Sequence, residues 1–112
     1  MQIRRGEIYF VNLNPVVGSE TAKTRPCLIL QNDIGNKFGD TTVVVPFLVP
    51  GDYPFIVNVK PTSANGLDRE RGLNFSKIRS VSIKRIKNKL GVVEDIYWLD
   101  IKKALLAECG FY

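Results

Sequence analysis

The stretch from Arg4 to Asp33 constrains the fold most, because it holds two strand-like runs that a polar loop separates. The second run, Pro26–Gln31, contains the uninterrupted apolar residues Cys27–Leu30. Such a run is typical of a central strand that is buried on both faces. Proline has no N–H to donate, so Pro26 must be the first residue of that strand or lie on a sheet edge. A residue before proline is held near extended geometry, so the pattern predicts a rigidly placed cation, Arg25, at the strand's mouth.

The rest of the chain predicts short strands followed by one helix. The first run indicates a strand over 7–13, with Ile8, Phe10 and Leu13 toward the core and Tyr9, Val11 and Asn12 toward the other face. Further strands are expected at 41–47, 54–59, 72–75 and 77–81, with loops over 14–24, 32–40 and 60–71 and one helical turn at 82–86. From Glu94 the apolar period becomes helical, with a stripe of Ile96, Leu99, Ile101, Leu105, Leu106 and Cys109. Gly110 suits the position just past the helix, while Asp100 leaves open a shorter helix from Ile101.

This pattern predicts an α+β fold that is mainly β: a small, strongly curved, β-barrel-like sheet with a C-terminal α-helix. We expect residues 1–112 to form one domain, since this length buries a modest core and shows no repeat or linker. The two cysteines, Cys27 and Cys109, are expected to be buried reduced thiols. The chain shows no secretory segment and no apolar stretch of membrane-spanning length, so we expect a cytoplasmic protein.

Positive charge is concentrated late in the chain. The net charge is +5, and the segment 76–93 carries six basic residues and no acidic one. This segment predicts either a solvated face or an electrostatic footprint for a phosphate backbone, which an acidic protein tail would also fit.

The available side chains restrict the chemistry. The chain has no histidine, which removes the usual general base at neutral pH. It has no metal-ligand motif and no glycine-rich phosphate loop, so we expect neither a metal nor a cofactor. Arg25 remains, and a guanidinium binds phosphate through two parallel N–H donors and stabilises developing charge. RNA supplies its own nucleophile, the 2′-OH, so positioning and charge stabilisation suffice for cleavage. The alternative for Arg25 is a surface cation or an ion pair with Glu20.

An ordered set of short motifs resembles the MazF/PemK toxins, which are endoribonucleases (mRNA interferases) of toxin–antitoxin pairs. The motifs are Arg5-Gly6-Glu7-Ile8-Tyr9, Asn14-Pro15, Gly18-Ser19-Glu20, Arg25-Pro26 and Gln31-Asn32-Asp33, followed more weakly by Gly66-Leu67-Asp68 and Ile78-Arg79-Ser80. The resemblance covers nearly the whole chain. It implies an SH3-like barrel, a homodimer, and a toxin that cleaves single-stranded mRNA selectively without a metal. It also implies an acidic, MazE-like antitoxin as partner.

The resemblance assigns roles to individual residues. Arg25 matches the catalytic arginine, and Glu20 matches the loop acid, whose alternative is a solvated carboxylate. The family's partner hydroxyl falls at Leu48, which cannot donate to phosphate, and the later-strand carboxylate of the Kid/PemK branch falls at Ser76. We therefore take Arg25, Glu20 and Ser76 as candidate catalytic residues, with Thr41, Thr42 and Ser19 as further candidate hydroxyls.

Candidate RNA-binding residues complete the prediction. They are Ser19, Gln31, Asn32, Asn36, Phe47, Lys77 and Arg79. The amides can contact base edges and the ring can stack on a base, whereas turn chemistry for Asn32 and Asn36 and core packing for Phe47 are the alternatives. Leu48 leaves an alternative function open: a toxin-like protein that binds RNA or antitoxin but cleaves RNA poorly. A topoisomerase poison of the CcdB type is a third possibility, although this chain lacks that group's terminal Trp-Gly-Ile.

Overall fold

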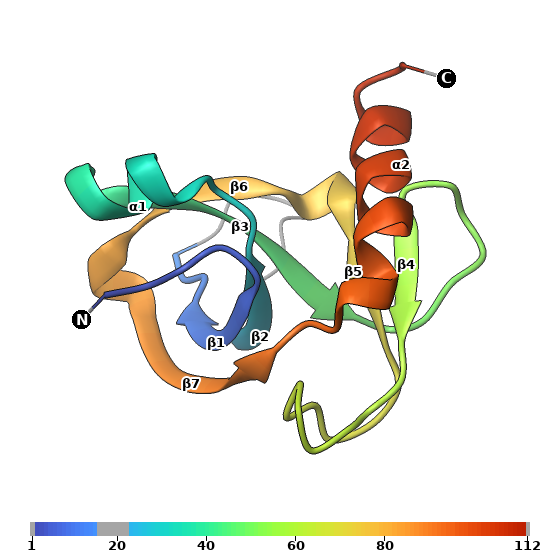
Figure 1. The fold of residues 1–112 in the computed structure, drawn as a ribbon, viewed down its shortest axis with the longest axis horizontal. Helices are drawn as coiled ribbons and strands as arrows, with labels where there is room; N and C mark the ends of the chain where they lie inside the picture. The colour runs from blue at the N-terminus through green and yellow to red at the C-terminus, as the bar shows by residue number, and fades with distance from the viewer. Residues whose placement is uncertain (1, 16–22, 112) are drawn as a thin grey trace.

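The computed structural model describes residues 2–15 and 23–111. Within them the chain forms seven strands, two α-helices and three 3₁₀ turns (Figure 1). In chain order these are β1 (Glu7–Asn12), β2 (Thr24–Ile29), α1 (Asp33–Phe38), β3 (Thr41–Leu48), β4 (Ile56–Val59), β5 (Arg71–Asn74), η1 (Phe75–Lys77), β6 (Arg79–Ser82), η2 (Ile83–Arg85), β7 (Ile86–Val92), η3 (Asp95–Tyr97) and α2 (Trp98–Glu108).

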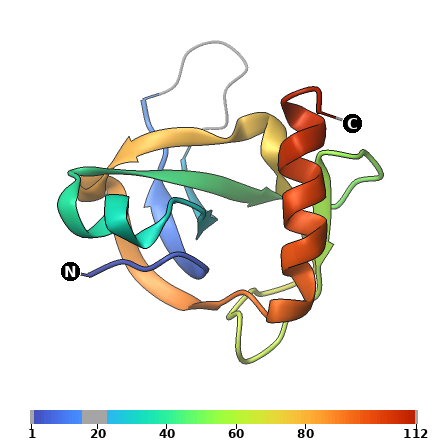
Figure 2. The ribbon, with the colours of Figure 1, turned by 45° about the horizontal axis from the view of Figure 1, so that its top comes forward.

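The strands form one antiparallel sheet with the order β4-β5-β3-β2-β1-β7, and β6 pairs with the first half of β3. The sheet curls strongly, and the two helices lie at opposite ends of β3 (Figures 1 and 2). The predicted fold class, mainly β with a curved barrel-like sheet and a C-terminal helix, is confirmed. The sheet does not close, because the path of paired strands ends at β4 and β7.

Both faces of the central strands are buried. Leu28, Val45 and Phe47 point into a core cluster that α2 covers with Ile101 and Ala104. Their neighbours along the strands belong to a second cluster inside the curl, formed by Ile3, Tyr9, Val11, Leu13, Cys27, Ile29, Val44, Val81 and Ile86. The uninterrupted apolar run of β2 follows from this two-sided burial, as its sequence predicted.

The two-sided core also corrects the predicted faces of β1. Tyr9 and Val11, expected away from the core, are buried in the second cluster, and Leu13 packs with them rather than with Ile8. Phe10 is only partly buried. A single-core prediction fails here because the curled sheet encloses apolar side chains on its concave face as well.

Two elements were missed in the sequence. Residues 33–38, predicted as loop, form α1, because the Asn32 side chain accepts a hydrogen bond from the Gly35 N–H at 2.8 Å and caps the helix. No strand was predicted over Ile86–Val92, because its exposed lysines interrupt the alternation of apolar and polar residues that indicates a strand. As an edge strand, β7 pairs only with β1, and its register shifts twice.

The C-terminal helix is shorter and more exposed than predicted. It begins at Trp98, neither at 94 nor at 101. Ile101 and Ala104 are buried, whereas Ile96, Leu99 and Leu106 of the predicted stripe are exposed. Gly110 follows the helix with φ +82°, as expected. Cys109 is exposed, contrary to prediction, while Cys27 is buried. No helix of the described residues is long and apolar enough to cross a membrane.

Candidate functional site

Arg25 is the second residue of β2, followed by Pro26 as the third. Pro26 pairs with Phe10 of β1, and the pairing of β2 with β3 begins only at Cys27. The proline ring therefore occupies an edge position that β3 does not reach, which is one of the two places its missing N–H allows. The paired backbone on the β1 side holds Arg25 opposite Val11.

The Arg25 guanidinium is half-buried and incompletely satisfied. Its Nε is buried and has no hydrogen-bond partner among the described residues. A buried donor without a partner costs about 1–3 kcal/mol, so it marks a place where a bound group is expected. A phosphate oxygen would satisfy this donor, since guanidinium and phosphate match in planar, two-bonded geometry.

Two further arginines converge on the same end of the sheet. An Nη1 N–H of Arg79 donates to the Leu13 carbonyl at 3.3 Å, and one of Arg85 donates to the Asn12 carbonyl at 3.2 Å. Each arginine uses one of its N–H donors for a backbone carbonyl at the end of β1. This hydrogen bond orients the guanidinium group, whose other N–H donors can bind a ligand. Arg79 was predicted as a candidate; Arg85 was not selected, and only its place in the basic segment pointed to it. Arg25, Arg79 and Arg85 together form a cationic group, which we call the arginine cluster.

Leu48 is the last residue of β3. The paired register ends with Cys27 opposite Pro46, and counting two residues further in each strand brings Leu48 level with Arg25, beyond the paired part of the two strands. On the other edge of β3, its end pairs with β5, and η1 with Ser76 packs beside it. Between Leu73, which pairs with Phe47, and Arg79, which pairs with Val44, Ser76 lies beside the middle of the second half of β3 and not level with Leu48. Ser76 is exposed, and its hydroxyl donates to the Asn74 Oδ1 at 2.6 Å.

The predicted base-reading amides lie at the other end of β3. Asn36 is buried, accepts from the Thr42 hydroxyl at 2.7 Å and donates to the Gln31 carbonyl at 3.0 Å. Six residues of β3 separate Thr42 from Leu48, about 20 Å at the usual rise. The amide of Asn36 is engaged within the protein, which agrees with the alternative of a structural role, and a contact of Asn36 with RNA stays a prediction. Asn32 serves as the cap of α1, and Gln31 donates to Asn36 and to the Thr41 carbonyl.

Phe47 has no exposed surface and packs in the core cluster beneath α2. This burial agrees with the alternative of core packing, and stacking of a base on Phe47 stays a prediction. Ser19 and Glu20 lie outside the described residues. The chain on either side of them is closed by hydrogen bonds from Leu13 N–H to the Lys23 carbonyl at 2.9 Å and from Lys23 N–H to Asn14 Oδ1 at 3.0 Å.

Cys27 lies beneath the arginine cluster but offers no nucleophile. Burial raises the pKa of its thiol to about 12, even though the nearby Arg79 and Arg25 charges lower it. The thiol stays protonated at neutral pH and is therefore inert. Over residues 2–15 and 23–111, no group of three or more metal-ligating side chains is close enough to hold an ion.

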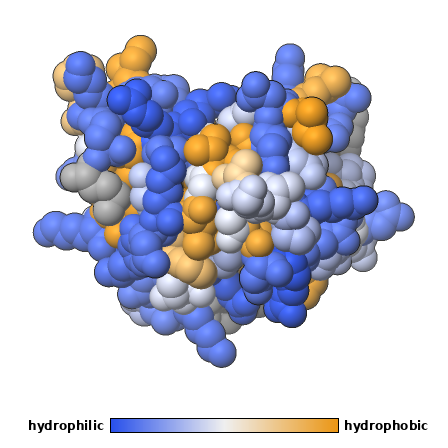
Figure 3. Space-filling model, turned by 60° about the horizontal axis from the view of Figure 1, so that its bottom comes forward, coloured by the Kyte–Doolittle hydropathy of each residue, from blue (hydrophilic) through white to orange (hydrophobic). Residues whose placement is uncertain are grey.

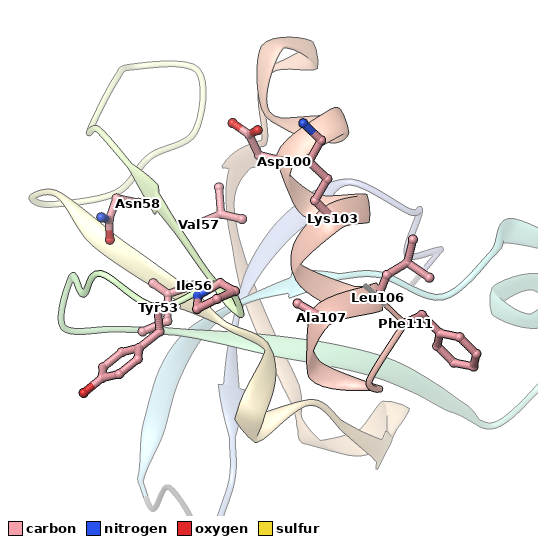
Figure 4. Close-up of a pocket in the computed structure, with 10 residues that line it drawn as sticks. Tyr53, Ile56, Val57, Asn58, Asp100, Lys103, Leu106, Ala107 and Phe111 are labelled. Carbon is pink, nitrogen blue, oxygen red and sulfur yellow. The ribbon is translucent and has the colours of Figure 1, made fainter.

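A large groove lies elsewhere, between β4 and α2. It has a volume of about 620 Å³ and is lined by Tyr53, Pro54, Ile56, Val57, Asn58, Asp100, Lys103, Leu106, Ala107 and Phe111. Figure 4 shows Tyr53 and Phe111 at its two ends, with Asp100 and Lys103 on the helix above. Hydrophobic side chains also gather within a polar surround on the face drawn in Figure 3. Such apolar surface is typical of contacts with other macromolecules.

A small, curled, antiparallel sheet with a C-terminal helix and a cluster of arginines at a strand end defines the class: a compact β protein with a site for a polyanion. The family described as PemK-like, MazF-like toxin of type II toxin–antitoxin systems matches residues 4–108, and the chain belongs to that family. This confirms the family that the sequence motifs indicated.

Individual relatives agree with this assignment. Endoribonuclease EndoA of Bacillus subtilis (strain 168) is 32% identical in an alignment 108 residues long that covers 94% of this chain and 92% of the relative. MazF from Deinococcus radiodurans superposes with a TM-score of 0.83 at 20% identity, covering 98% of each chain. An endoribonuclease from a mycobacterial species, solved in complex with its cognate antitoxin, gives 0.78 at 22% identity over 98% of this chain and 97% of that one.

Proposed function

We propose that this toxin is a sequence-selective, metal-independent endoribonuclease that cleaves single-stranded mRNA. The observation that carries the proposal is the buried Nε of Arg25 within the arginine cluster, which has no hydrogen-bond partner among residues 2–15 and 23–111. Three guanidinium groups at one strand end attract a phosphodiester, and EndoA, at 32% identity, is named an endoribonuclease.

The reaction needs only groups that hold the phosphate and move one proton. The ribose 2′-OH attacks the adjacent phosphorus, the bond to the 5′ oxygen breaks, and the products are a 2′,3′-cyclic phosphate and a 5′-OH. Arg25 donates two N–H bonds to the phosphate oxygens, where charge accumulates in the transition state. The proton released by the 2′-OH ends on the leaving 5′ oxygen, so no redox or metal chemistry is required.

In this proposal the residues around Arg25 either bind flanking phosphates or transfer the proton. Arg79 and Arg85 hold flanking phosphates, and Lys77 lies one residue beyond Ser76 in η1. Ser76 and Glu20 are the candidates for proton transfer. The Ser76 hydroxyl would have to leave Asn74 to donate to substrate, but its oxygen is free to accept without moving.

A toxin that binds RNA but cleaves it slowly is the second candidate function. The observation that favours it is Leu48, because an aliphatic side chain at the end of β3, two residues past the Cys27–Pro46 pair, adds no donor to the phosphate. This candidate shares the binding surface with the first and differs only in rate.

We further propose two protein partners. An acidic, MazE-like antitoxin would compete with RNA for the arginine cluster, and one of the similar structures holds a cognate antitoxin. A second copy of the chain would cover the groove between β4 and α2, where Tyr53 and Phe111 are exposed. We treat residues 1–112 as one toxin domain and place it in the cytoplasm, where its mRNA substrate is found.

The test is cleavage of a long single-stranded RNA in excess EDTA, followed by mapping of the new 5′ ends. We expect cuts at a short recurring motif with 5′-OH ends. Cleavage that returns only with added Mg²⁺ or Mn²⁺ would refute the mechanism. Tight RNA binding with no cuts would select the second candidate.

A further inference from the structure

A second, smaller cleft lies on the other flank of α2. It has a volume of about 290 Å³ and is lined by Arg5, Leu30, Trp98, Ile101, Lys102 and Leu105. This α2 cleft lies between the helix and the N-terminal loop, and its floor is apolar. Its volume is near the lower limit for ligand pockets, which suits a bulky side chain rather than a whole cofactor.

The rim of the α2 cleft is cationic and fixed in place. The Arg5 guanidinium carbon lies 4.0 Å from the centroid of the Trp98 ring, a cation–π contact. The Arg5 N–H donates to Asp33 Oδ1 at 2.7 Å, so the backbone that carries this cation is anchored to the start of α1. Lys102 supplies the second positive charge, and none of the lining residues is acidic. The Asp33 carboxylate also interacts with the Arg5 charge, and its Oδ1 accepts hydrogen bonds from the Arg5 backbone N–H and the Asn36 side chain.

The α2 cleft is separate from the arginine cluster. Leu30 lies five residues along the chain from Arg25, about 17 Å at the rise of a strand. The two residues also lie on different faces of the sheet. Leu30 packs against the core beneath α2, whereas Arg25 lies near Cys27 on the concave face. An occupant of this cleft therefore leaves Arg25 open.

The lining favours a peptide over a nucleic acid. Arg5 covers a face of Trp98, and an added Cβ at Gly6 would lie 3.2 Å from the Trp98 Cζ2, so the ring is enclosed on these sides. The ring is therefore a poor stacking platform for a base. What remains open is an aliphatic floor with two cations beside it, which complements an apolar side chain flanked by carboxylates.

We propose that the α2 cleft binds a short acidic segment of the antitoxin, with one bulky apolar side chain on Leu30, Ile101 and Leu105 and carboxylates on Arg5 and Lys102. The identity of the partner rests on the proposed toxin function. This contact anchors the antitoxin without blocking RNA, and it adds to the affinity of any segment that covers the arginine cluster, because the second contact becomes intramolecular.

Trp98 is the single tryptophan of the chain, so its fluorescence reports on the α2 cleft directly. The probe is the peptide acetyl-Glu-Glu-Leu-Phe-Glu-amide, titrated into the full-length protein, with calorimetry as a second readout. We expect a saturable change in Trp98 fluorescence, and we expect binding to weaken as salt rises. Arg5→Gln and Lys102→Ala should each weaken binding by about two- to five-fold, the usual effect of removing an exposed charge.

Matched controls separate this site from its neighbours. Lys103→Ala removes a cation of the same helix that lines the larger groove instead, and it should leave the affinity unchanged. The peptide acetyl-Lys-Lys-Leu-Phe-Lys-amide, with the charge reversed, should not bind. A non-cleavable RNA oligonucleotide should not displace the acidic peptide, and RNA cleavage should continue when the peptide is saturating.

Three results would overturn the inference: no saturable signal, equal binding of both peptides, or displacement by RNA. The last would assign the cleft to the RNA path. Because fluorescence and calorimetry need no cleavage, a protein that fails to cut RNA can still support or refute this site.

Discussion

Leu48 ends β3 level with Arg25 of β2, two residues past the Cys27–Pro46 pair at which the paired register of these strands ends. The position level with the half-buried Arg25 thus carries an aliphatic side chain rather than a hydroxyl. The backbone that positions the cation is intact, because β1 pairing holds Arg25 and Pro26 in place. Mutations of Arg25 and of Leu48 therefore test two properties independently: positive charge at the phosphate and proton donation beside it.

Arg25→Ala should remove the main charge-stabilising donor. We expect single-turnover cleavage of a defined oligonucleotide to fall by about 10²–10³-fold, the usual effect of losing one such donor. Arg25→Lys should restore only part of the rate, because an ammonium keeps the charge without the planar fork. Circular dichroism should show an unchanged fold. Arg69→Ala is the control, since Arg69 is a largely exposed loop cation. Full activity in folded Arg25→Ala would place the active site elsewhere.

Leu48→Thr should add a hydroxyl beside the phosphate. If proton donation limits the rate, cleavage should rise while RNA affinity changes little, as measured by single-turnover kinetics and by binding to a non-cleavable RNA. Leu48→Val is the matched control, because it is similar in shape to threonine and lacks the hydroxyl. An equal gain in both variants would point to side-chain volume as the cause. No gain in either would direct the search to Ser76.

Asn65 should be a stability residue rather than a site residue. Its side chain has no exposed surface and joins Thr62, Leu67, the Lys60 carbonyl and Glu94 through hydrogen bonds of 2.9–3.1 Å. Asn65→Ala would leave buried groups unpaired and should lower the free energy of unfolding by about 1–3 kcal/mol. Urea unfolding measures this loss, and a change below that range would contradict the role assigned to the network.

Glu94 should make part of this stability depend on pH. Burial alone would raise the pKa of its carboxyl, but hydrogen bonds from Thr62 and Asn65 hold the pKa below its usual 4.5. A lowered pKa in the folded state contributes stability that is present above about pH 5 and is lost as the pH falls through the folded pKa. Glu94→Gln should therefore reduce stability at pH 7 and flatten its decline in acid. If the free energy of unfolding of Glu94→Gln falls in acid as steeply as that of the parent protein, Glu94 does not contribute to the pH dependence of stability.

Leu106→Glu should test the proposed homodimer. Leu106 lines the groove between β4 and α2 and is 38% exposed, so a carboxylate there would be buried without a partner on association. We expect light scattering to show a shift from dimer to monomer. Ile34→Glu is the control, since Ile34 is 75% exposed on α1, at the far end of β3. An unchanged mass in the Leu106 variant, or a monomeric parent, would exclude this groove as the dimer face.

The sequence alone determined the local features whose causes are local. The apolar run of β2 predicted two-sided burial, Pro26 predicted an edge position, and Gly110 predicted the end of the helix, because each follows from the side chain's own size or backbone geometry. The ordered motifs also indicated the family and with it the mainly β fold.

The tertiary structure decided which residues meet. Arg25, Arg79 and Arg85 come together only because β1, β2 and the β6–β7 region converge at one end of a curled sheet. Long-range packing also decided the surroundings of Asn36 and Phe47: strand pairing buried Phe47, and Thr42 and Gln31 engaged the amide of Asn36. Burial and proximity depend on long-range packing, which the spacing of residues in a single sequence does not encode.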